Sequence, residues 1–229
     1  MRSNAEGLGT TFSIEDRGIT PPGAAGHLDQ IIQTRRSIRR YAPDPIPREL
    51  LDQILGAAMR APSPHNRQPW RFAVLKNATS KARLAMAMGE RLRADRTRDG
   101  DRADAIEADV TRSRTRIVGA PVVIVVALTM RDMDQYADQH RTHAEHTMAV
   151  QSVATVAQNI LLLAHARGLG SCWMCAPLFC PDVVRTSLAL PADWEPQALI
   201  TLGRPASPGR DRPLLAADET IVWIDDDAD

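Results

Sequence analysis

The chain has 229 residues, of which 44% are hydrophobic and 24% charged, and positive and negative side chains balance to a formal net charge of +0. This predicts one soluble globular domain with a real core, and the charge balance gives no reason to expect a nucleic-acid or membrane partner. No apolar run approaches the length of a membrane span, and three cysteines, an odd number, favour a reducing cytoplasm over a disulfide framework.

Residues 1–26 are polar, contain no apolar signal-peptide segment, and are expected to form a flexible arm before a domain over 27–229. The elements then expected, in chain order, are helices over 27–34 and 46–60, a strand over 72–75, a helix over 80–93, a charged turn over 93–101, a helix over 103–118, a strand over 121–128, a helix over 143–167, a strand over 171–174, a helix over 181–190, a strand over 197–202 and a β-type segment over 220–224. This order predicts an α+β fold in which helices surround a small mixed sheet.

Two of these elements indicate how the domain is built. The helix over 143–167 is apolar on most faces, so we expect it at the centre of the protein or at an interface. The β-type segment over 220–224 has no partner nearby in the sequence, and we expect it to complete a sheet elsewhere, for example in a second subunit.

The stretch from 61 to 72 carries the densest set of polar side chains. Three prolines break any regular element there, so the backbone is expected to be a fixed loop. The loop holds Ser63, His65, Asn66, Gln68 and two arginines. Such a rigid loop between a helix and a strand is a common place for ligand contacts, although an ordinary proline-rich connector has the same composition.

Arginines form two separate groups. Four of the six residues from 35 to 40 are arginine and one is Ser37, which together suit a phosphate monoester. Arg210 and Arg212 lie far along the chain. Whether the two groups converge on one phosphate is left open by the sequence, because basic helix ends are common in any protein.

The cysteines and histidines are not expected to bind a metal. Cys172 and Cys175 have the spacing of a metal or thiol-redox pair, but no second pair exists and the intervening residues read as a buried strand. His140, His143 and His146 lack the pattern of a zinc-binding helix. No nucleophile elbow, phosphate-binding P-loop or dinucleotide-binding glycine motif is found either.

Three motifs, taken in this order, resemble the FMN-dependent nitroreductase family: Arg-Arg-Ser-Ile-Arg at 35–39, Pro-Ser-Pro-His-Asn-Arg-Gln-Pro-Trp-Arg-Phe at 62–72 and Gly-Leu-Gly-Ser-Cys-Trp at 168–173. The resemblance extends from Leu28 to Val222. It implies a nitroreductase-like fold, a homodimer whose subunits exchange terminal segments, and FMN bound at the subunit interface.

The resemblance also implies which residues contact the cofactor. They are Arg35, Arg36, Ser37, Ile38 and Arg39 at the phosphate and the pyrimidine side of the ring, Pro62, Ser63, Pro64 and Asn66 from the partner subunit, the backbone of Met174, Cys175 and Ala176 against the isoalloxazine, and Arg210 and Arg212 closing on the phosphate. A cation such as Arg39 near flavin N1 would stabilise the reduced ring, and a hydrogen bond at N5 would orient hydride transfer. No side chain is expected to act as a catalytic acid or base.

A narrower similarity joins segments 92–95, 99–100, 103–107, 144–148 and 190–196 to the nitroreductase domain of coenzyme F420 biosynthesis. It implies that reduced FMN delivers hydride to the electron-poor double bond of dehydro-F420. It also implies that Asp95 contacts the substrate, whereas the residue pattern alone is equally typical of a solvated carboxylate at a helix end.

Two other functions stay open. One is a general NAD(P)H-dependent reductase of nitro compounds and quinones. The other is a non-catalytic protein that binds a flavin or a deazaflavin without turnover.

Overall fold

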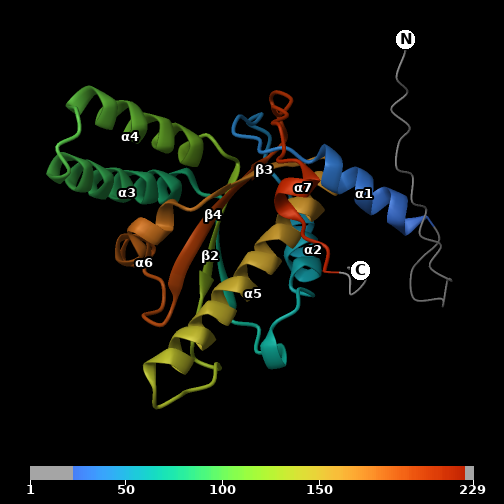
Figure 1. The fold of residues 1–229 in the computed structure, drawn as a ribbon. Helices are drawn as coiled ribbons and strands as arrows, with labels where there is room; N and C mark the ends of the chain where they lie inside the picture. Colours follow the sequence, from blue (N-terminus) through green and yellow to red (C-terminus); the bar gives the residue numbers. More distant parts are fainter. Residues whose placement is uncertain (1–22, 225–229) are drawn as a thin grey trace, which may run out of the picture. The chain divides into compact units, whose positions relative to one another are not determined.

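The structure, a computed structural model, describes residues 23–224 and divides the chain into two units, 1–34 and 35–229 (Figure 1). The described part of the first unit is helix α1 (Ala24–Thr34), which begins three residues before the expected start at 27. The expected arm over 1–26 lies outside the described residues except for its last four. The expected domain division therefore stays a prediction.

The second unit alternates helices and strands. Its elements are α2 (Arg48–Ala58), η1 (Pro64–Asn66), β1 (Trp70–Leu75), α3 (Ala78–Arg98), α4 (Ala103–Val118), β2 (Val122–Leu128), α5 (Gln139–Ala166), β3 (Gly170–Met174), η2 (Ala176–Phe179), α6 (Pro181–Leu188), β4 (Glu195–Gly203) and α7 (Ala217–Thr220). The expected α+β class is confirmed, and the range 103–118 matches α4 at both ends.

The four strands form one sheet in the order β1-β2-β4-β3. Every pair of neighbouring strands is antiparallel: Trp70 faces Leu128 across β1 and β2, and Gly170 faces Gly203 across β3 and β4. The parallel pairing that a mixed sheet requires is confined, in the described chain, to an isolated bridge between Ser37 and Ser171. The small sheet is thus found, with a more uniform strand direction than the sequence predicts.

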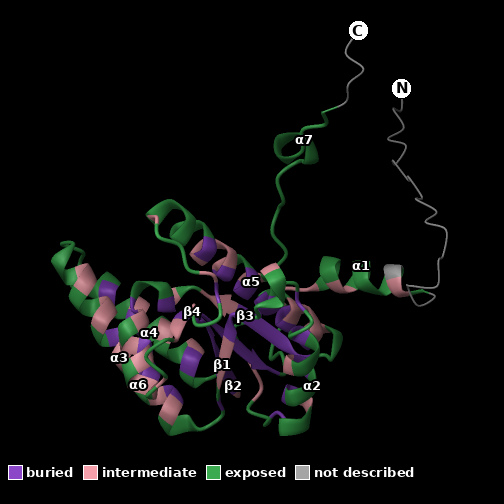
Figure 2. Ribbon diagram, turned by 90° about the horizontal axis from the view of Figure 1, so that it is seen from below, coloured by how far each residue is buried: buried purple, intermediate pink, exposed green. Residues whose placement is uncertain are grey.

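Helices cover both faces of the sheet, as the buried residues in Figure 2 illustrate. The side chains of Ile124 and Val126 on β2 pack with α2 and α5, whereas those of Val123 and Val125 pack with α3 and α6. Because alternate residues of a strand point to opposite faces, β2 must be apolar throughout, and all seven of its residues are buried.

Helix α5 is the central helix of the unit, as predicted. Nine of its 28 residues are buried, including Val156, Ile160 and Ala164, and it packs against α2 and the sheet. Its length and composition alone would allow a membrane crossing, contrary to the expectation that no segment reaches that size. The buried face identifies α5 instead as the core helix of a soluble fold.

The charged turn expected over 93–101 is largely helical. Helix α3 continues through Arg98, and the chain turns at Gly100, whose φ of 82° suits glycine. Arg93 pairs with Glu107 and Arg96 with Asp109, so the charges join α3 to α4. The sequence pattern, which suits a lid or a solvated surface turn equally, does not display these cross-helix ion pairs.

The segment over 220–224 is not a strand within this chain. Thr220 ends the short helix α7, and residues 221–224 form no regular element. A strand needs a neighbour to bond its backbone, and the described chain offers it none. The side chains of Val222, Trp223 and Ile224 are exposed, each by at least 80%.

Candidate functional site

The segment that carries the first arginine motif is fastened beside the start of β3. The amide of Ile38 donates to the carbonyl of Ser171 at 2.9 Å, and the amide of Ala42 donates to the carbonyl of Arg204 at 2.9 Å. The Tyr41 hydroxyl donates to the carbonyl of Ile38 at 2.5 Å. Burial raises the pKa of Tyr41, so this hydroxyl keeps its proton and remains a fixed anchor.

Positive charge gathers around one buried thiol in this region. Arg35, Arg39 and Arg116 all lie close enough to Cys172 to favour its thiolate, although burial is the larger influence and raises the pKa of the Cys172 thiol. Burial and then the charge of Arg39 lower the pKa of Arg116, which records repulsion between like charges. Across residues 23–224, no carboxylate pairs with Arg35, Arg39 or Arg116.

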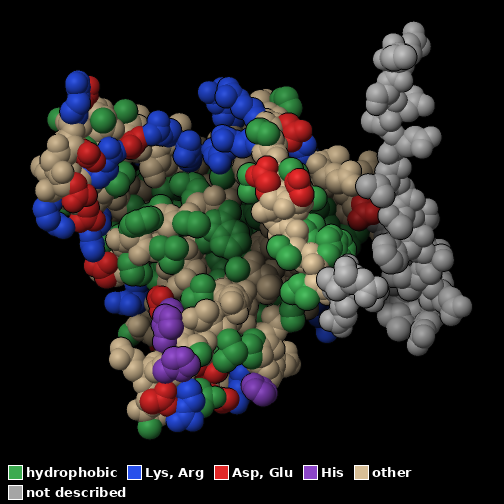
Figure 3. Space-filling view, viewed as in Figure 1, with side chains coloured by type: hydrophobic (Ala, Val, Ile, Leu, Met, Phe, Trp, Pro, Cys, Tyr) green, Lys and Arg blue, Asp and Glu red, His purple; other side chains and the backbone are tan. Residues whose placement is uncertain are grey.

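We call Arg35, Arg39 and Arg116 the arginine cluster. Lys and Arg side chains gather along the upper edge of the face drawn in Figure 3. Cations held together without acidic partners make a site for an anion, because a phosphate would remove the repulsion between them. Arg116 lies in the last turn of α4 and was not singled out from the sequence.

The second group of arginines, Arg210 and Arg212, is joined to the first motif through Asp211, which lies between them in the sequence. Arg36 Nη2 lies 2.8 Å from Asp211 Oδ1, and Asp211 is flanked by Arg210 and Arg212. Glycine at position 209 lets the two segments pack this closely, because a Cβ at that position would lie only 2.1 Å from Arg36 Cβ. The fold therefore brings the two arginine groups together, with Arg36 paired to Asp211 and the side chains of Arg210 and Arg212 exposed.

The proline-rich loop is rigid and strained. Residues 65, 66 and 68 all adopt positive φ, at 49°, 54° and 49°, without being glycine. Hydrogen bonds hold this shape: the amide of Gln68 donates to Ser63 Oγ at 3.0 Å, and Gln68 Nε2 donates to Asn66 Oδ1 at 3.1 Å. Strained backbone that its surroundings enforce is most often found at functional sites.

Within one chain, this loop and the arginine cluster lie at opposite corners of the sheet. The loop enters β1 at Trp70, on one edge, where the strands end at Leu128 and begin at Glu195. The arginine cluster adjoins Ser171, on the other edge and at the other end of the strands. Ser63 and Asn66 therefore do not approach Arg35 and Arg39 in a single protomer.

The segment Met174, Cys175 and Ala176 starts at the last residue of β3 and runs beyond the far end of the strand. At about 3.3 Å per residue, β3 separates this segment from the arginine cluster by roughly 13 Å. Cys175 is exposed, whereas Cys172 and Cys180 are buried, and all three thiols are free. In the described part of the chain, no group of three or more His, Cys, Asp or Glu residues is arranged to hold a metal ion.

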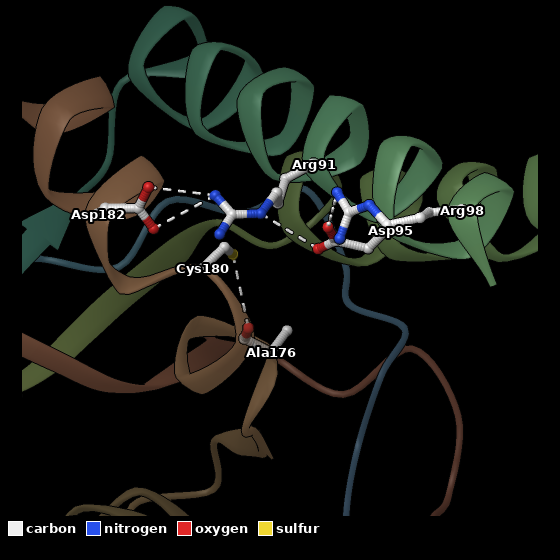
Figure 4. Close-up of polar contacts among 6 residues, drawn as sticks. All are labelled: Arg91, Asp95, Arg98, Ala176, Cys180 and Asp182. Carbon is white, nitrogen blue, oxygen red and sulfur yellow. Dashed lines mark hydrogen bonds and ion pairs between the residues drawn. The ribbon is translucent and has the colours of Figure 1, made fainter.

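Asp95 is engaged by two arginines on α3, as Figure 4 shows. Its carboxylate accepts from Arg91 Nε at 3.1 Å and from Arg98 Nη2 at 3.2 Å. Arg91 also donates a hydrogen bond to Asp182 in the first turn of α6, at 3.1 Å, and this bond, helped by the charge of Arg91, keeps the pKa of Asp182 below its usual value. Asp95 thus belongs to a surface ion-pair network between α3 and α6, and its role toward a substrate stays a prediction.

These observations define a class of protein. Among the described residues, arginines without acidic partners lie at the start of β3 and a strained polar loop lies at the opposite corner of the sheet, and such an arginine cluster suits a phosphate-bearing ligand. Among the described residues, one buried side-chain nitrogen has no hydrogen-bond partner, and it is Nε1 of Trp173. An unsatisfied donor therefore lies on β3, the strand that begins beside the arginine cluster.

Comparison with known proteins identifies the family. Residues 32–204 match the nitroreductase family. The chain is 31% identical to an NADH dehydrogenase of Thermus thermophilus, over 82% of this chain and 92% of that protein. It is 30% identical to a 5,6-dimethylbenzimidazole synthase of Rhodospirillum rubrum, over 80% and 84% of the two chains.

A solved structure agrees with this result. The crystal structure described as a nitroreductase in complex with FMN, from Desulfovibrio desulfuricans, is 27% identical with a TM-score of 0.65, and the match covers 86% of this chain and 96% of that one. The chain belongs to the nitroreductase family, and the predicted class of enzyme, an FMN-dependent oxidoreductase, is confirmed at this level.

Adding one methyl group at Gly170 tests how the arginine motif is held. A Cβ there would lie 2.7–2.9 Å from three side-chain atoms of Ile38, so Gly170→Ala must push the motif away from β3. We expect a loss of about 1–3 kcal/mol in the free energy of unfolding, measured by urea denaturation. The matched control is Gly56→Ala in α2, where the added Cβ meets nothing within 4 Å.

Gly56→Ala should stabilise the protein slightly, because alanine favours a helix over glycine. Shortening Ile38 to alanine in the Gly170→Ala background should recover only part of the loss, because it removes the contacts with Cγ1 and Cγ2 but keeps the 2.7 Å contact with Cβ. Equal stability of the Gly170→Ala and Gly56→Ala variants would contradict the tight packing described above.

Proposed function

We propose that this chain binds FMN through the arginine cluster and reduces electron-poor small molecules with hydride drawn from NAD(P)H. The observation that carries the proposal is the set of three unpaired cations, Arg35, Arg39 and Arg116, in a nitroreductase fold. Bound FMN would supply a flavin ring that accepts and passes on a hydride. The similarity to an NADH dehydrogenase supports a nicotinamide donor.

The chain's own residues fit such a cofactor. The cations of the cluster and the exposed hydroxyl of Ser37 suit a phosphate monoester, which takes both ionic and hydrogen-bonding contacts. Arg39 and Arg116 would also stabilise negative charge on a reduced ring. In this proposal Met174, Cys175 and Ala176 border the ring, because they continue β3 beyond the phosphate end.

A homodimer completes the proposal. Ser63 and Asn66 lie at the corner opposite the arginine cluster, so a second copy has to supply them to a shared site. The outer edge of β1 has no partner strand in the described chain, and exposed apolar side chains, Val222, Trp223 and Ile224, lie near the end of the chain. Exchange of the segment over 220–224 between subunits would cover both the outer edge of β1 and these apolar side chains. The dimer is proposed to work in the cytoplasm.

The particular substrate is the finer part of the proposal. The two curated relatives carry different reactions, so family membership alone leaves the acceptor open. Dehydro-F420 is the acceptor that the narrower sequence similarity favours, with Asp95 as a contact. Nitro compounds are the acceptors that the description of the Desulfovibrio desulfuricans structure favours, and quinones belong with them to the alternative of a general reductase.

One experiment separates these substrates. The purified protein is checked for a mass of twice 25.1 kDa by light scattering, loaded with FMN, and assayed without oxygen. NAD(P)H oxidation is followed with a neutral quinone, and dehydro-F420 is offered in parallel with product detected by a gain of two mass units. Protein offered riboflavin, which lacks the phosphate, is the control.

We expect NAD(P)H oxidation with the quinone, dependent on FMN and weak with riboflavin. Reduction of dehydro-F420 with little quinone activity would support the narrower assignment. FMN binding without either reaction would overturn the enzyme proposal in favour of a binding protein, and failure to bind FMN would contradict the site itself.

A further inference from the structure

A cavity of about 550 Å³ lies beside the proline-rich loop, away from the arginine cluster. Its lining includes two guanidinium groups, Arg67 and Arg71, and three aromatic side chains, Trp70, Phe72 and Trp194. An open cavity that combines flat apolar walls with a few polar groups is typical of a small-molecule site. Neither the arginine motif nor the segment after β3 contributes to it.

The two arginines keep donors available in this cavity. Arg67 uses Nη2 to bond Asp134 at 2.5 Å, and Arg71 uses Nη1 to bond the carbonyls of Gln68 and Trp70 at 3.1 and 2.8 Å. A guanidinium carries five N–H groups, so each keeps several that no described residue accepts. The nearest acid to Arg71, Asp132, is 3.6 Å away, which is beyond a hydrogen bond.

The cavity is continuous with the loop proposed to face the cofactor. Gln68 lines the cavity and bonds both Ser63 and Asn66, the residues that a partner subunit would offer to the flavin. A ligand seated here would therefore extend from the flavin-facing side of the loop toward Trp194. Fixed carbonyl bonds hold the Arg71 guanidinium in place, which lowers the entropy that binding would cost.

We infer that this cavity holds an anionic arm, a carboxylate or phosphate, of a planar acceptor whose reactive end reaches the flavin. The inference rests on the proposed function, and it narrows the acceptors of that function to those that carry an acid group. The free donors of Arg67 and Arg71 bind the anion, and the aromatic walls cover the adjoining flat part. Asp132 and Asp134 lie beside these arginines and limit the affinity for the anion.

Binding is measured by calorimetry on FMN-loaded, oxidised protein without NAD(P)H, so that no turnover occurs. The probes are para-nitrobenzoate, para-nitrophenyl phosphate and the neutral para-nitrobenzyl alcohol. The variants are Arg67→Gln and Arg71→Gln, and the matched control is Arg48→Gln on α2, which removes the same charge from an exposed pair with Asp52.

Each cavity variant should weaken the better-bound anionic probe by about tenfold, the effect of one charge-assisted hydrogen bond. It should leave binding of the neutral alcohol unchanged. A preference for the carboxylate or for the phosphate probe tells which acid the natural arm carries. Arg71→Lys keeps a charge and should retain more affinity than Arg71→Gln if the fold is intact.

Equal loss for the neutral and anionic probes, or the same loss in Arg48→Gln, would overturn the inference. So would a wild-type protein that binds the three probes alike. Failure of the proposed function has a different signature, because FMN binding or quinone reduction is then absent, whereas anion binding at Arg67 and Arg71 is still measured by the same calorimetry on cofactor-free protein.

Discussion

Replacing Arg35 and Arg39 together by glutamine is expected to weaken FMN binding by about a hundredfold, because each charge-assisted hydrogen bond to phosphate contributes roughly 1.5 kcal/mol or more. The measurement is a fluorescence titration of FMN into cofactor-free protein. Arg48→Gln, with the same loss of charge on an exposed surface, is the control and should bind FMN normally.

The free energy of unfolding of the cofactor-free protein is a second readout, and it is not expected to fall when FMN binding weakens. The charge of Arg39 lowers the pKa of Arg116, so the cluster carries unrelieved repulsion when no anion is bound. Removing Arg39 should leave the free energy of unfolding unchanged or slightly higher. If Arg39 had only a structural role, its replacement would lower the free energy of unfolding. A marked decrease in that free energy without any change in FMN affinity would contradict the anion site.

The second large effect is expected in the core. Ile160 on α5 is completely buried and packs in the cluster that joins α2, α5 and the sheet. Ile160→Ala should lower the free energy of unfolding by about 2–5 kcal/mol, because the lost methyl groups leave a cavity that neighbours fill only in part. Urea denaturation of cofactor-free protein measures it without added stabilisation from bound ligand.

Met86→Ala is the matched control for this prediction. Met86 lies on α3 and is 58% exposed, so its truncation should change stability by less than about 0.5 kcal/mol. A similar cost at both positions would mean that α5 is not the central packing element. That conclusion would also follow if Ile160→Ala lowered the free energy of unfolding by no more than a surface substitution does.

The sequence predicted elements well where one physical signal dominates. The apolar run of β2 and the apolar surface of α5 are fixed by burial alone, and both were predicted as buried elements. The end of α3 was missed because Arg93 and Arg96 find their partners on α4, a long-range fact that local charge does not reveal. The pairing of the segment over 220–224 with a second subunit stays a prediction, because a β-type segment needs a partner strand and the described part of this chain offers none.

The candidate site divides in the same way. The motif at 35–39 and the loop at 61–72 were visible as clusters of unusual residues, but their positions at opposite corners depend on strand order, which the sequence does not encode locally. Arg116 escaped notice because an arginine at a helix C-terminus is ordinary. Its distinguishing property, a cationic neighbour without an acid, exists only in the folded chain.

The residues with positive φ in the proline-rich loop present their side chains at a cost in stability. Glycine at His65 or Gln68 would relieve a backbone conformation that costs about 1 kcal/mol or more. It would also remove the side chain that the conformation presents. The loop therefore keeps these side chains at a cost in stability, so a more heat-resistant loop and one that presents His65 and Gln68 are different sequences.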